Sequence, residues 1–230
     1  MSSLKFFPSG VLFDFDGVIV DSKTVHHNAW QQAHQMLFDR DLPYSYPNEH
    51  NSGITSMQTA SFLAAAVGKE QQNEELAILK LHILLNDSPF PDLLPGARAL
   101  IGFLDRHGIP FGIASNAPTA FINHSMAGYG LEVANIIGAD QITNPKPAPD
   151  AYLLCAEVAG VSPDRYGAVY VFEDSVAGVS AGVAAGMITV GVETTLSRDE
   201  LLNAGAVYSC RNLREAFDGG WFASNSVSIE

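Results

Sequence analysis

Cysteine is scarce in this sequence, which has only Cys155 and Cys210 among its 230 residues. Neither residue belongs to a C-x-x-C pattern, so the cysteines predict neither a zinc site nor a disulfide framework. Cys155 lies within an apolar run, and we interpret it as a small buried hydrophobic residue.

Basic residues are also few, because 12 Lys and Arg residues stand against 25 Asp and Glu residues, for a formal net charge of −13. A general affinity for nucleic acid or for an anionic membrane surface requires a basic face, so we expect neither partner. A small anionic substrate remains compatible with this charge, since a local pocket can oppose the field of the whole chain. The acidic surface favours a monomer or a small homo-oligomer.

Long apolar runs are absent as well, and no stretch of about 18 apolar residues could cross a membrane. The apolar stretch within residues 1–8 is too short for a signal peptide, so we expect a cytoplasmic protein. Hydrophobic residues still make up 47% of the chain and charged residues 16%. This balance favours a folded core over disorder, and the length fits one large domain or a domain with an insertion.

The order of apolar and helical segments predicts an α/β fold with a helical insertion. Buried strands are expected at residues 10–15, 109–115, 168–172 and 188–192. Helices are expected in the core at residues 149–159, 176–185 and 198–204, and in the insertion at residues 24–38, 56–67 and 73–85. Continuous apolar strands separated by helices predict a parallel sheet that is covered on both faces. We therefore predict a core domain of residues 1–20 and 92–230, with a helical cap domain at residues 21–91.

Two carboxylates follow the first predicted strand, in the stretch FDFDGV at residues 13–18. Asp14 and Asp16 would lie at the carboxyl edge of the sheet, where open α/β sheets bind ligands. Carboxylates this close repel each other, and a divalent cation would relieve the repulsion while leaving one of them to exchange protons. A capping aspartate next to a turn aspartate is the structural alternative, and this stretch alone does not choose between the two.

A second acidic pair, Glu173 and Asp174, follows the strand predicted at residues 168–172. Its structural alternative is a helix cap, in which Asp174 or Ser175 accepts hydrogen bonds from the first amides of the next helix. If the two acidic strands are neighbours in one parallel sheet, Asp14, Asp16 and Asp174 converge on a site that suits the oxygen preference of Mg²⁺.

A lysine between prolines supplies the positive charge for such a site. Lys146 lies in the stretch NPKPAPD at residues 144–150, where the prolines stiffen the loop and fix the direction of the ammonium group. A surface lysine is usually only solvated, but one held beside a carboxylate cluster is better explained as a phosphate anchor. Ser115 and Asn116 end the strand after the insertion and offer further donors to the same anion.

Together these motifs resemble those of the haloacid dehalogenase superfamily, and in particular of its phosphotransferases with an aspartate nucleophile. Residues 14–22 resemble the first family motif, Ser115 and Asn116 the second, residues 146–150 the third, and residues 173–187 the fourth. The insertion resembles the small cap of the β-phosphoglucomutase and sugar-phosphatase branch. The resemblance covers nearly the whole chain and implies a Rossmann-like α/β core with this cap.

The resemblance also implies a role for each matching residue. Asp14 would attack phosphorus to form an aspartyl-phosphate, while Asp16 would protonate the leaving oxygen and then deprotonate water. Mg²⁺ would be held by the Asp14 carboxylate, the Asp16 backbone carbonyl and Asp174, with Glu173 as a further ligand or as a neighbour of the ligands. The presence of Asp16 counts against dehalogenase chemistry, because that branch of the superfamily lacks the second aspartate.

Substrate recognition is divided between the core and the cap. Lys146 and Ser115 would balance the charge of the transferring phosphoryl group. The cap covers the site and is expected to decide the substrate, and residues 51–56 resemble the cap loop that reaches into it. His26 and Trp30 are spaced to share one helix face, although His26 could equally be a partly exposed helix residue. The expected substrate-binding residues are His26, Trp30, Gly53, Thr55, Ser115, Asn116 and Lys146.

Two departures from the family pattern favour a phosphatase over a β-phosphoglucomutase. The mutases carry an arginine in the cap loop where this chain has Ser56, and a lysine after the second motif where it has Ala117 and Pro118. A mutase must hold a bisphosphate while it reorients, whereas a phosphatase needs only to admit water. Lys80 is a candidate replacement for one lost cation. We predict a Mg²⁺-dependent phosphatase for a small sugar phosphate or related phosphorylated metabolite, with β-phosphoglucomutase as the alternative.

Two further alternatives are not favoured. A non-catalytic binding protein with this fold would typically have lost a catalytic carboxylate, and none is missing here. Phosphonate hydrolysis in this superfamily needs a cap lysine that forms a Schiff base, and His26 stands near its expected place.

Overall fold

The computed structural model describes residues 8–44, 46 and 53–219. Residues 1–7, which entered the signal-peptide argument, and Asn51 and Ser52 of the expected cap loop lie outside the described residues. Within the described part of the chain, no helix combines the length and the apolar character needed to cross a membrane.

A parallel six-stranded sheet forms the centre of the fold, in the order β5-β4-β1-β6-β7-β8. Its strands are β1 Gly10–Phe13, β4 Phe111–Ala114, β5 Ile136–Ile137, β6 Val169–Glu173, β7 Ile188–Val192 and β8 Tyr208–Cys210. The predicted parallel α/β sheet is confirmed, and all four predicted strands are present within it. The two outermost strands, β5 and β8, are additions that the sequence did not predict.

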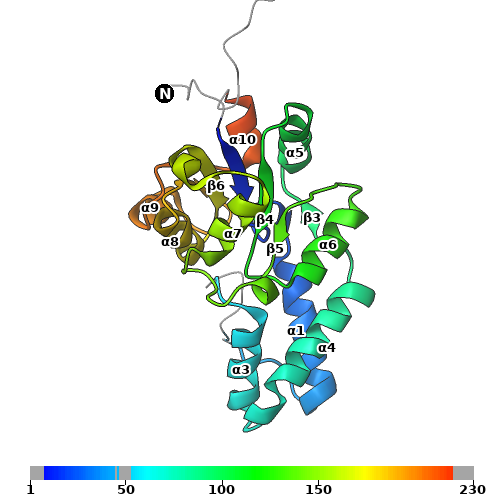
Figure 1. The fold of residues 1–230 in the computed structure, drawn as a ribbon. Coiled ribbons are helices and arrows are strands. Elements are labelled where there is room, and N and C mark those ends of the chain that lie inside the picture. The colour runs from blue at the N-terminus through cyan, green and yellow to red at the C-terminus, as the bar shows by residue number, and fades with distance from the viewer. Residues whose placement is uncertain (1–7, 45, 47–52, 220–230) are drawn as a thin grey trace, which may run out of the picture.

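Helices cover both faces of this sheet (Figure 1). The helices of the core are α5 Ala97–Arg106, α6 Thr119–Gly128, α7 Asp150–Val158, α8 Val176–Ala184, α9 Arg198–Asn203 and α10 Leu213–Asp218. Successive residues of a strand point to opposite faces, and the strand β1 shows this clearly. Val11 and Phe13 belong to an apolar cluster with residues of α5 and α10, whereas Leu12 belongs to a second cluster with residues of α7 and α8.

A separate group of helices lies beyond the carboxyl ends of the strands (Figure 1). It consists of α1 Lys23–Phe38, α3 Ser56–Ala66 and α4 Asn73–Asn86, with a short 3₁₀ turn at Glu70–Gln72. The bounds agree with the helices predicted from the sequence to within one residue. Both α1 and α3 pack against α4, and the fully buried Trp30, Leu63 and Leu76 lie in their interior.

Two short antiparallel strands mark the points where the chain enters and leaves this helical group. The strand β2, Val20–Asp21, pairs with β3, Asp92–Leu93. We propose that the boundary between the core domain, residues 1–20 and 92–230, and the cap domain, residues 21–91, passes through this ladder. The ladder ties both crossings together, so the cap is held over the edge of the sheet where β1 ends.

Candidate active site

Three neighbouring strands end at the same edge of the sheet. The strand β1 lies between β4 and β6, and all three run parallel. Ser115 follows β4, Asp14 follows β1, and Glu173 is the last residue of β6. The backbone N–H of Asp14 donates to the carbonyl of Phe172 at 2.9 Å, which joins the two acidic strand ends.

A cavity of about 30 Å³ lies at this edge, between core and cap. Its lining consists of Asp14, Asp16, Gly53, Ile54, Ser115, Asn116, Ala117, Lys146, Glu173, Asp174 and Ser175. The structure therefore brings both predicted acidic pairs, the loop lysine and the second-motif pair together around one space. Gly53 is the predicted cap residue that joins them there.

Lys146 is the central cation of the cavity, and it is 5% exposed. Its Nζ lies 2.7 Å from Oδ1 of Asp14, 2.5 Å from Oε1 of Glu173 and 2.9 Å from the hydroxyl of Tyr152. Burial lowers the pKa of Lys146, but attraction by Asp14 and Glu173 outweighs it, so the pKa lies above its ordinary value. The lysine is therefore a permanent positive charge directly beside the first aspartate, and not a solvated surface residue.

Glu173 is held by donors on both of its carboxylate oxygens. Besides Lys146 and the Tyr152 hydroxyl on Oε1, its Oε2 accepts from the backbone N–H groups of Asp174 and Ser175, at 3.0 and 3.2 Å, and from Oγ of Ser175 at 3.1 Å. Ser175 also caps α8, because its Oγ accepts from the N–H of Gly178. The helix-cap interpretation thus holds for Ser175, while both acidic residues turn toward the cavity.

The donor set of the cavity fits a divalent cation. Asp14, Glu173 and Asp174 each offer a carboxylate oxygen within 4.8 Å of the others, and all three residues are buried. Burial, opposed by Lys146 and reinforced by Glu173 and Asp16, raises the pKa of Asp14 to about 7. Burial, followed by repulsion from Glu173 and Asp14, raises the pKa of Asp174 well above its ordinary value. One lysine does not balance these carboxylates, and hard oxygen ligands of this kind suit Mg²⁺.

Two side chains at the beginning of the cap segment contact the carboxyl group of Asp16. Oδ1 of Asp16 accepts from the hydroxyl of Ser22 and lies 3.2 Å from Nε2 of His26. His26 is 3% exposed, and its ring packs against that of Phe121 with 4.9 Å between the ring centroids. The reading of His26 as a partly exposed helix residue is therefore wrong, because α1 turns this side chain inward to Asp16.

The cap loop reaches the core through Asn116. Its Nδ2 donates to the carbonyl of Gly53 at 2.5 Å, and its Oδ1 accepts from the backbone N–H of Lys146 at 3.1 Å. Asn116 therefore joins the cap to the lysine loop at the rim of the cavity.

The other predicted cap residues lie elsewhere. Trp30 is fully buried inside the cap, 4.9 Å below the ammonium group of Lys80, and it does not line the cavity. Thr55 begins α3 through a capping box with Gln58. Lys80 is itself buried, and its ammonium group donates to Oγ of Ser56 at 3.0 Å. Ser56 is the position at which the sequence analysis noted the missing arginine of the mutases, and Lys80 was its candidate replacement.

Three residues of the site were missed by sequence reasoning. Tyr152 holds both Lys146 and Glu173, and burial raises its pKa well above the ordinary value, so its hydroxyl stays protonated. Thr195 donates to Oδ2 of Asp174. The third residue is Ser22, which is the last residue of the first motif, so the motif itself could have pointed to it. Tyr152 and Thr195 lie outside the four motifs, and nothing in the sequence indicated them.

Gly17→Ala is expected to destabilise the protein and to disturb the acidic cluster. Gly17 has a φ of +82°, and a Cβ at this position would collide with the carboxylate of Asp174. Gly68→Ala is the matched control, because Gly68 has a φ of +71° and no atom within 4 Å. Both variants adopt an unfavourable left-handed conformation, and only Gly17→Ala adds an overpacking cost of about 1–3 kcal/mol. Thermal unfolding should place its midpoint roughly 3–10 °C below that of Gly68→Ala, and equal midpoints would contradict the close approach.

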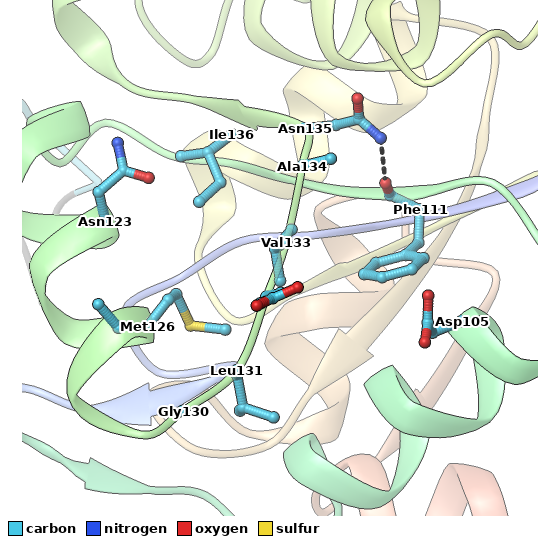
Figure 2. A pocket seen from close by; sticks show the side chains of 12 residues that line it. Asp105, Phe111, Asn123, Met126, Gly130, Leu131, Val133, Ala134, Asn135 and Ile136 are labelled. Atoms are coloured by element: carbon cyan, nitrogen blue, oxygen red, sulfur yellow. Dashed lines mark hydrogen bonds between the residues drawn. The ribbon is translucent and has the colours of Figure 1, made fainter.

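A larger cavity, of about 690 Å³, lies away from these residues, beside α6 and β5 (Figure 2). Its floor is apolar, with Met126, Leu131 and Val133, and the amide of Asn135 is used in a hydrogen bond to the carbonyl of Phe111 at 2.8 Å. Its lining contains two carboxylates but no Lys, Arg or His. This larger cavity therefore has no cation in its lining to compare with Lys146 of the smaller one.

The comparisons with known proteins agree with this geometry. A family model described as haloacid dehalogenase-like hydrolase matches residues 8–186. Hexitol phosphatase A of Escherichia coli K12 is 33% identical over 190 residues, which cover 80% of this chain and 82% of that protein. β-Phosphoglucomutase of Bacillus subtilis is 32% identical over 196 residues, which cover 79% and 82%.

The solved structures show the same fold. The crystal structure of β-phosphoglucomutase from Clostridium difficile matches with a TM-score of 0.74 at 24% identity, covering 94% of this chain and 97% of that one. The family model spans well over half of the chain, and its range includes the motifs at Asp14, Ser115, Lys146 and Asp174. The chain is therefore a member of the haloacid dehalogenase-like hydrolases.

Proposed function

We propose that this chain is a Mg²⁺-dependent phosphatase that hydrolyses a small sugar phosphate or related phosphorylated metabolite through an aspartyl-phosphate. One observation carries the proposal: the buried carboxylate of Asp14 lies 2.7 Å from the ammonium group of Lys146, with a second aspartate, Asp16, lining the same cavity. A nucleophile, an acid–base group and an anion anchor are the three parts that phosphoryl transfer through a carboxylate requires.

In the first step, a carboxylate oxygen of Asp14 attacks phosphorus, and the bond from phosphorus to the ester oxygen breaks. Asp16 gives its proton to that leaving oxygen, so that an alcohol departs and an aspartyl-phosphate remains. The bonds from Ser22 and His26 to Oδ1 fix the orientation of the Asp16 carboxyl group during the transfer.

In the second step, Asp16 has become a carboxylate and takes a proton from the attacking water. The water oxygen bonds to phosphorus while the bond from phosphorus to Asp14 breaks, which releases inorganic phosphate and restores both aspartates. Lys146 and Ser115 balance the charge on the phosphoryl oxygens in both steps.

Mg²⁺ would be held by Asp14, by Asp174 and by the backbone carbonyl of Asp16. When bound, it supplies positive charge to the phosphoryl oxygens and allows a second anion to approach Asp14. Because Glu173 already accepts hydrogen bonds on both oxygens, its proposed part is to orient Lys146 and the loop of Asp174.

β-Phosphoglucomutase is the second candidate, and one contact favours it. The buried Lys80 donates to Ser56, so a cation does stand behind the cap position where the mutases carry arginine. Pro118 still supplies no charge at the other position, and the first candidate is preferred for that reason. The two activities differ in their product, which makes them separable by experiment.

The test is a ³¹P NMR time course with Mg²⁺ and β-glucose 1-phosphate, primed with glucose 1,6-bisphosphate, and a parallel sample with a hexitol phosphate. Inorganic phosphate is expected as the main product, and only from protein with an intact Asp14. A glucose 6-phosphate signal without free phosphate would instead establish the mutase and overturn the phosphatase.

A further inference from the structure

A buried hydroxyl group lies directly behind the lysine of the candidate active site. It belongs to Tyr152 of α7, which is fully buried and is not part of the lining of the catalytic cavity. The hydroxyl oxygen lies 2.9 Å from Nζ of Lys146 and 2.7 Å from Oε1 of Glu173. Because that Nζ also lies 2.5 Å from Oε1 of Glu173, the three atoms form a closed triangle of hydrogen bonds.

The direction of each hydrogen bond in the triangle follows from the chemistry of the groups. An ammonium group can only donate, and a tyrosine hydroxyl has one proton to give and lone pairs to accept with. The hydroxyl of Tyr152 therefore accepts from Lys146 and donates to Glu173. It connects the loop that carries the lysine to the end of β6, and it does so from a third element, the helix α7.

The third bond completes the hydrogen bonding of the ammonium group. A lysine ammonium has three N–H donors, and the three acceptors here are Oδ1 of Asp14 at 2.7 Å, Oε1 of Glu173 and the hydroxyl of Tyr152. Asp14 and Glu173 line the catalytic cavity, whereas Tyr152 holds the ammonium group from the side of the core. A lysine is otherwise a point charge on a flexible stem, and this bond restricts where the charge can lie.

Packing alone does not explain why this residue carries a hydroxyl group. Tyr152 belongs to the apolar cluster that also contains Leu12, Ala114 and Val171, a place that the ring of phenylalanine would fill equally well. A hydroxyl group costs free energy in such a place unless it is hydrogen-bonded. The ring centroid lies 4.4 Å from Nζ of Lys146, and phenylalanine would keep that contact too. The two hydrogen bonds are therefore what tyrosine adds at this position.

We infer that Tyr152 is a positioning residue for phosphoryl transfer, and that its hydroxyl fixes the ammonium group of Lys146 where it meets the phosphoryl oxygens. The inference rests on the proposed phosphatase function and gives α7 a part in it. Because Tyr152 does not line the cavity, it acts through Lys146 and Glu173. A donor that is fixed before the reaction stabilises the charge of the transition state better than one that must first be ordered.

Tyr152→Phe removes the hydroxyl and keeps the ring. With 4-nitrophenyl phosphate and saturating Mg²⁺, we expect kcat to fall about 10–100-fold, the range found when a hydrogen bond that orients a metal-binding side chain is removed. We expect KM to change less than about threefold, because the lost interaction belongs to the transition state. Tyr170→Phe is the matched control: Tyr170 is 7% exposed near the amino end of β6, and its kcat should stay within about twofold of the wild type. Thermal unfolding of both variants reports any loss of fold.

The ammonium group itself can be followed by NMR of protein labelled with ¹⁵N in its lysine side chains, without Mg²⁺ or substrate. A buried ammonium with three acceptors exchanges its protons slowly with water, so Lys146 should give a resolved signal, which Lys146→Met assigns by its loss. In Tyr152→Phe, we expect this exchange to become about tenfold faster or more, because one donor has lost its acceptor. Lys80 is also fully buried and is the internal control, since its signal should not change.

Two results would each overturn the inference while leaving the phosphatase intact. One is a kcat of Tyr152→Phe within about twofold of the wild type, or a loss of kcat no larger than that of Tyr170→Phe. The other is an ammonium signal of Lys146 that is as well protected in Tyr152→Phe as in the wild type. The proposed function fails in a different way: if the wild type releases phosphate from no ester in the presence of Mg²⁺, that function and the role of Tyr152 in it are both overturned.

Discussion

Asp14→Asn is expected to abolish turnover, with a fall in kcat of about 10⁴-fold or more. Asparagine keeps the size of the side chain but has no carboxylate oxygen to attack phosphorus, so the covalent route is closed. The aspartate lies at the end of the central strand, and Lys146 contacts its Oδ1 at 2.7 Å. Steady-state phosphate release with saturating Mg²⁺ measures the effect.

Asp105→Asn is the matched control for this experiment. Asp105 is an exposed carboxylate on α5 that lines the larger cavity beside α6 and β5. The substitution makes the same chemical change in another cavity, so its kcat should stay within twofold of the wild type. Thermal unfolding of both variants separates a lost nucleophile from a lost fold. Activity of Asp14→Asn within tenfold of the wild type would rule out Asp14 as the nucleophile.

Asp16→Asn is expected to slow the hydrolysis of alkyl phosphates by about 10²–10⁴-fold, the usual contribution of general acid–base catalysis. An alkoxide is a poor leaving group, so the loss of the proton donor slows the first step, in which the aspartyl-phosphate forms. With 4-nitrophenyl phosphate, the leaving group needs no proton, and the slow step becomes the attack of water on the aspartyl-phosphate.

Rapid mixing of Asp16→Asn with 4-nitrophenyl phosphate should therefore give a burst of 4-nitrophenolate, followed by slow turnover. The amplitude of the burst should approach one equivalent of active sites. An equal loss of kcat toward both substrates, with no burst, would contradict a role in proton transfer. It would indicate that Asp16 acts only by holding the chain after β1 in place, through its contacts with Ser22 and His26.

Much of the fold could be predicted because its signals are local. The strands β1 and β6 are continuous apolar runs that end in carboxylates, and the neighbouring helices have clear breaks at glycine and proline. The strand β5 has only two residues, Ile136 and Ile137, and β8 has three. Strands this short have no periodicity, and their pairing depends on the strands already in place.

The core part of the candidate site could be predicted because parallel strands bring their carboxyl ends together. Asp14, Ser115 and Glu173 meet for this reason, although they are far apart in the sequence. The cap residues do not follow strands of the parallel sheet, so the sheet topology did not predict where their side chains lie. Spacing placed His26 and Trp30 on one helix face, but only packing decides that His26 reaches Asp16 while Trp30 lies beneath Lys80. Tyr152 was missed because a buried tyrosine in a helix looks like any other core residue.

The most direct test of the account is to trap the covalent intermediate. Asp16→Asn turning over 4-nitrophenyl phosphate should accumulate the aspartyl-phosphate, and borohydride reduction of the acid-quenched protein should convert that residue to homoserine. Mass spectrometry of the peptides locates the change. The account predicts homoserine at position 14 alone, and none in the unreacted protein. Homoserine at another aspartate, or turnover with no phosphorylated protein, would contradict it.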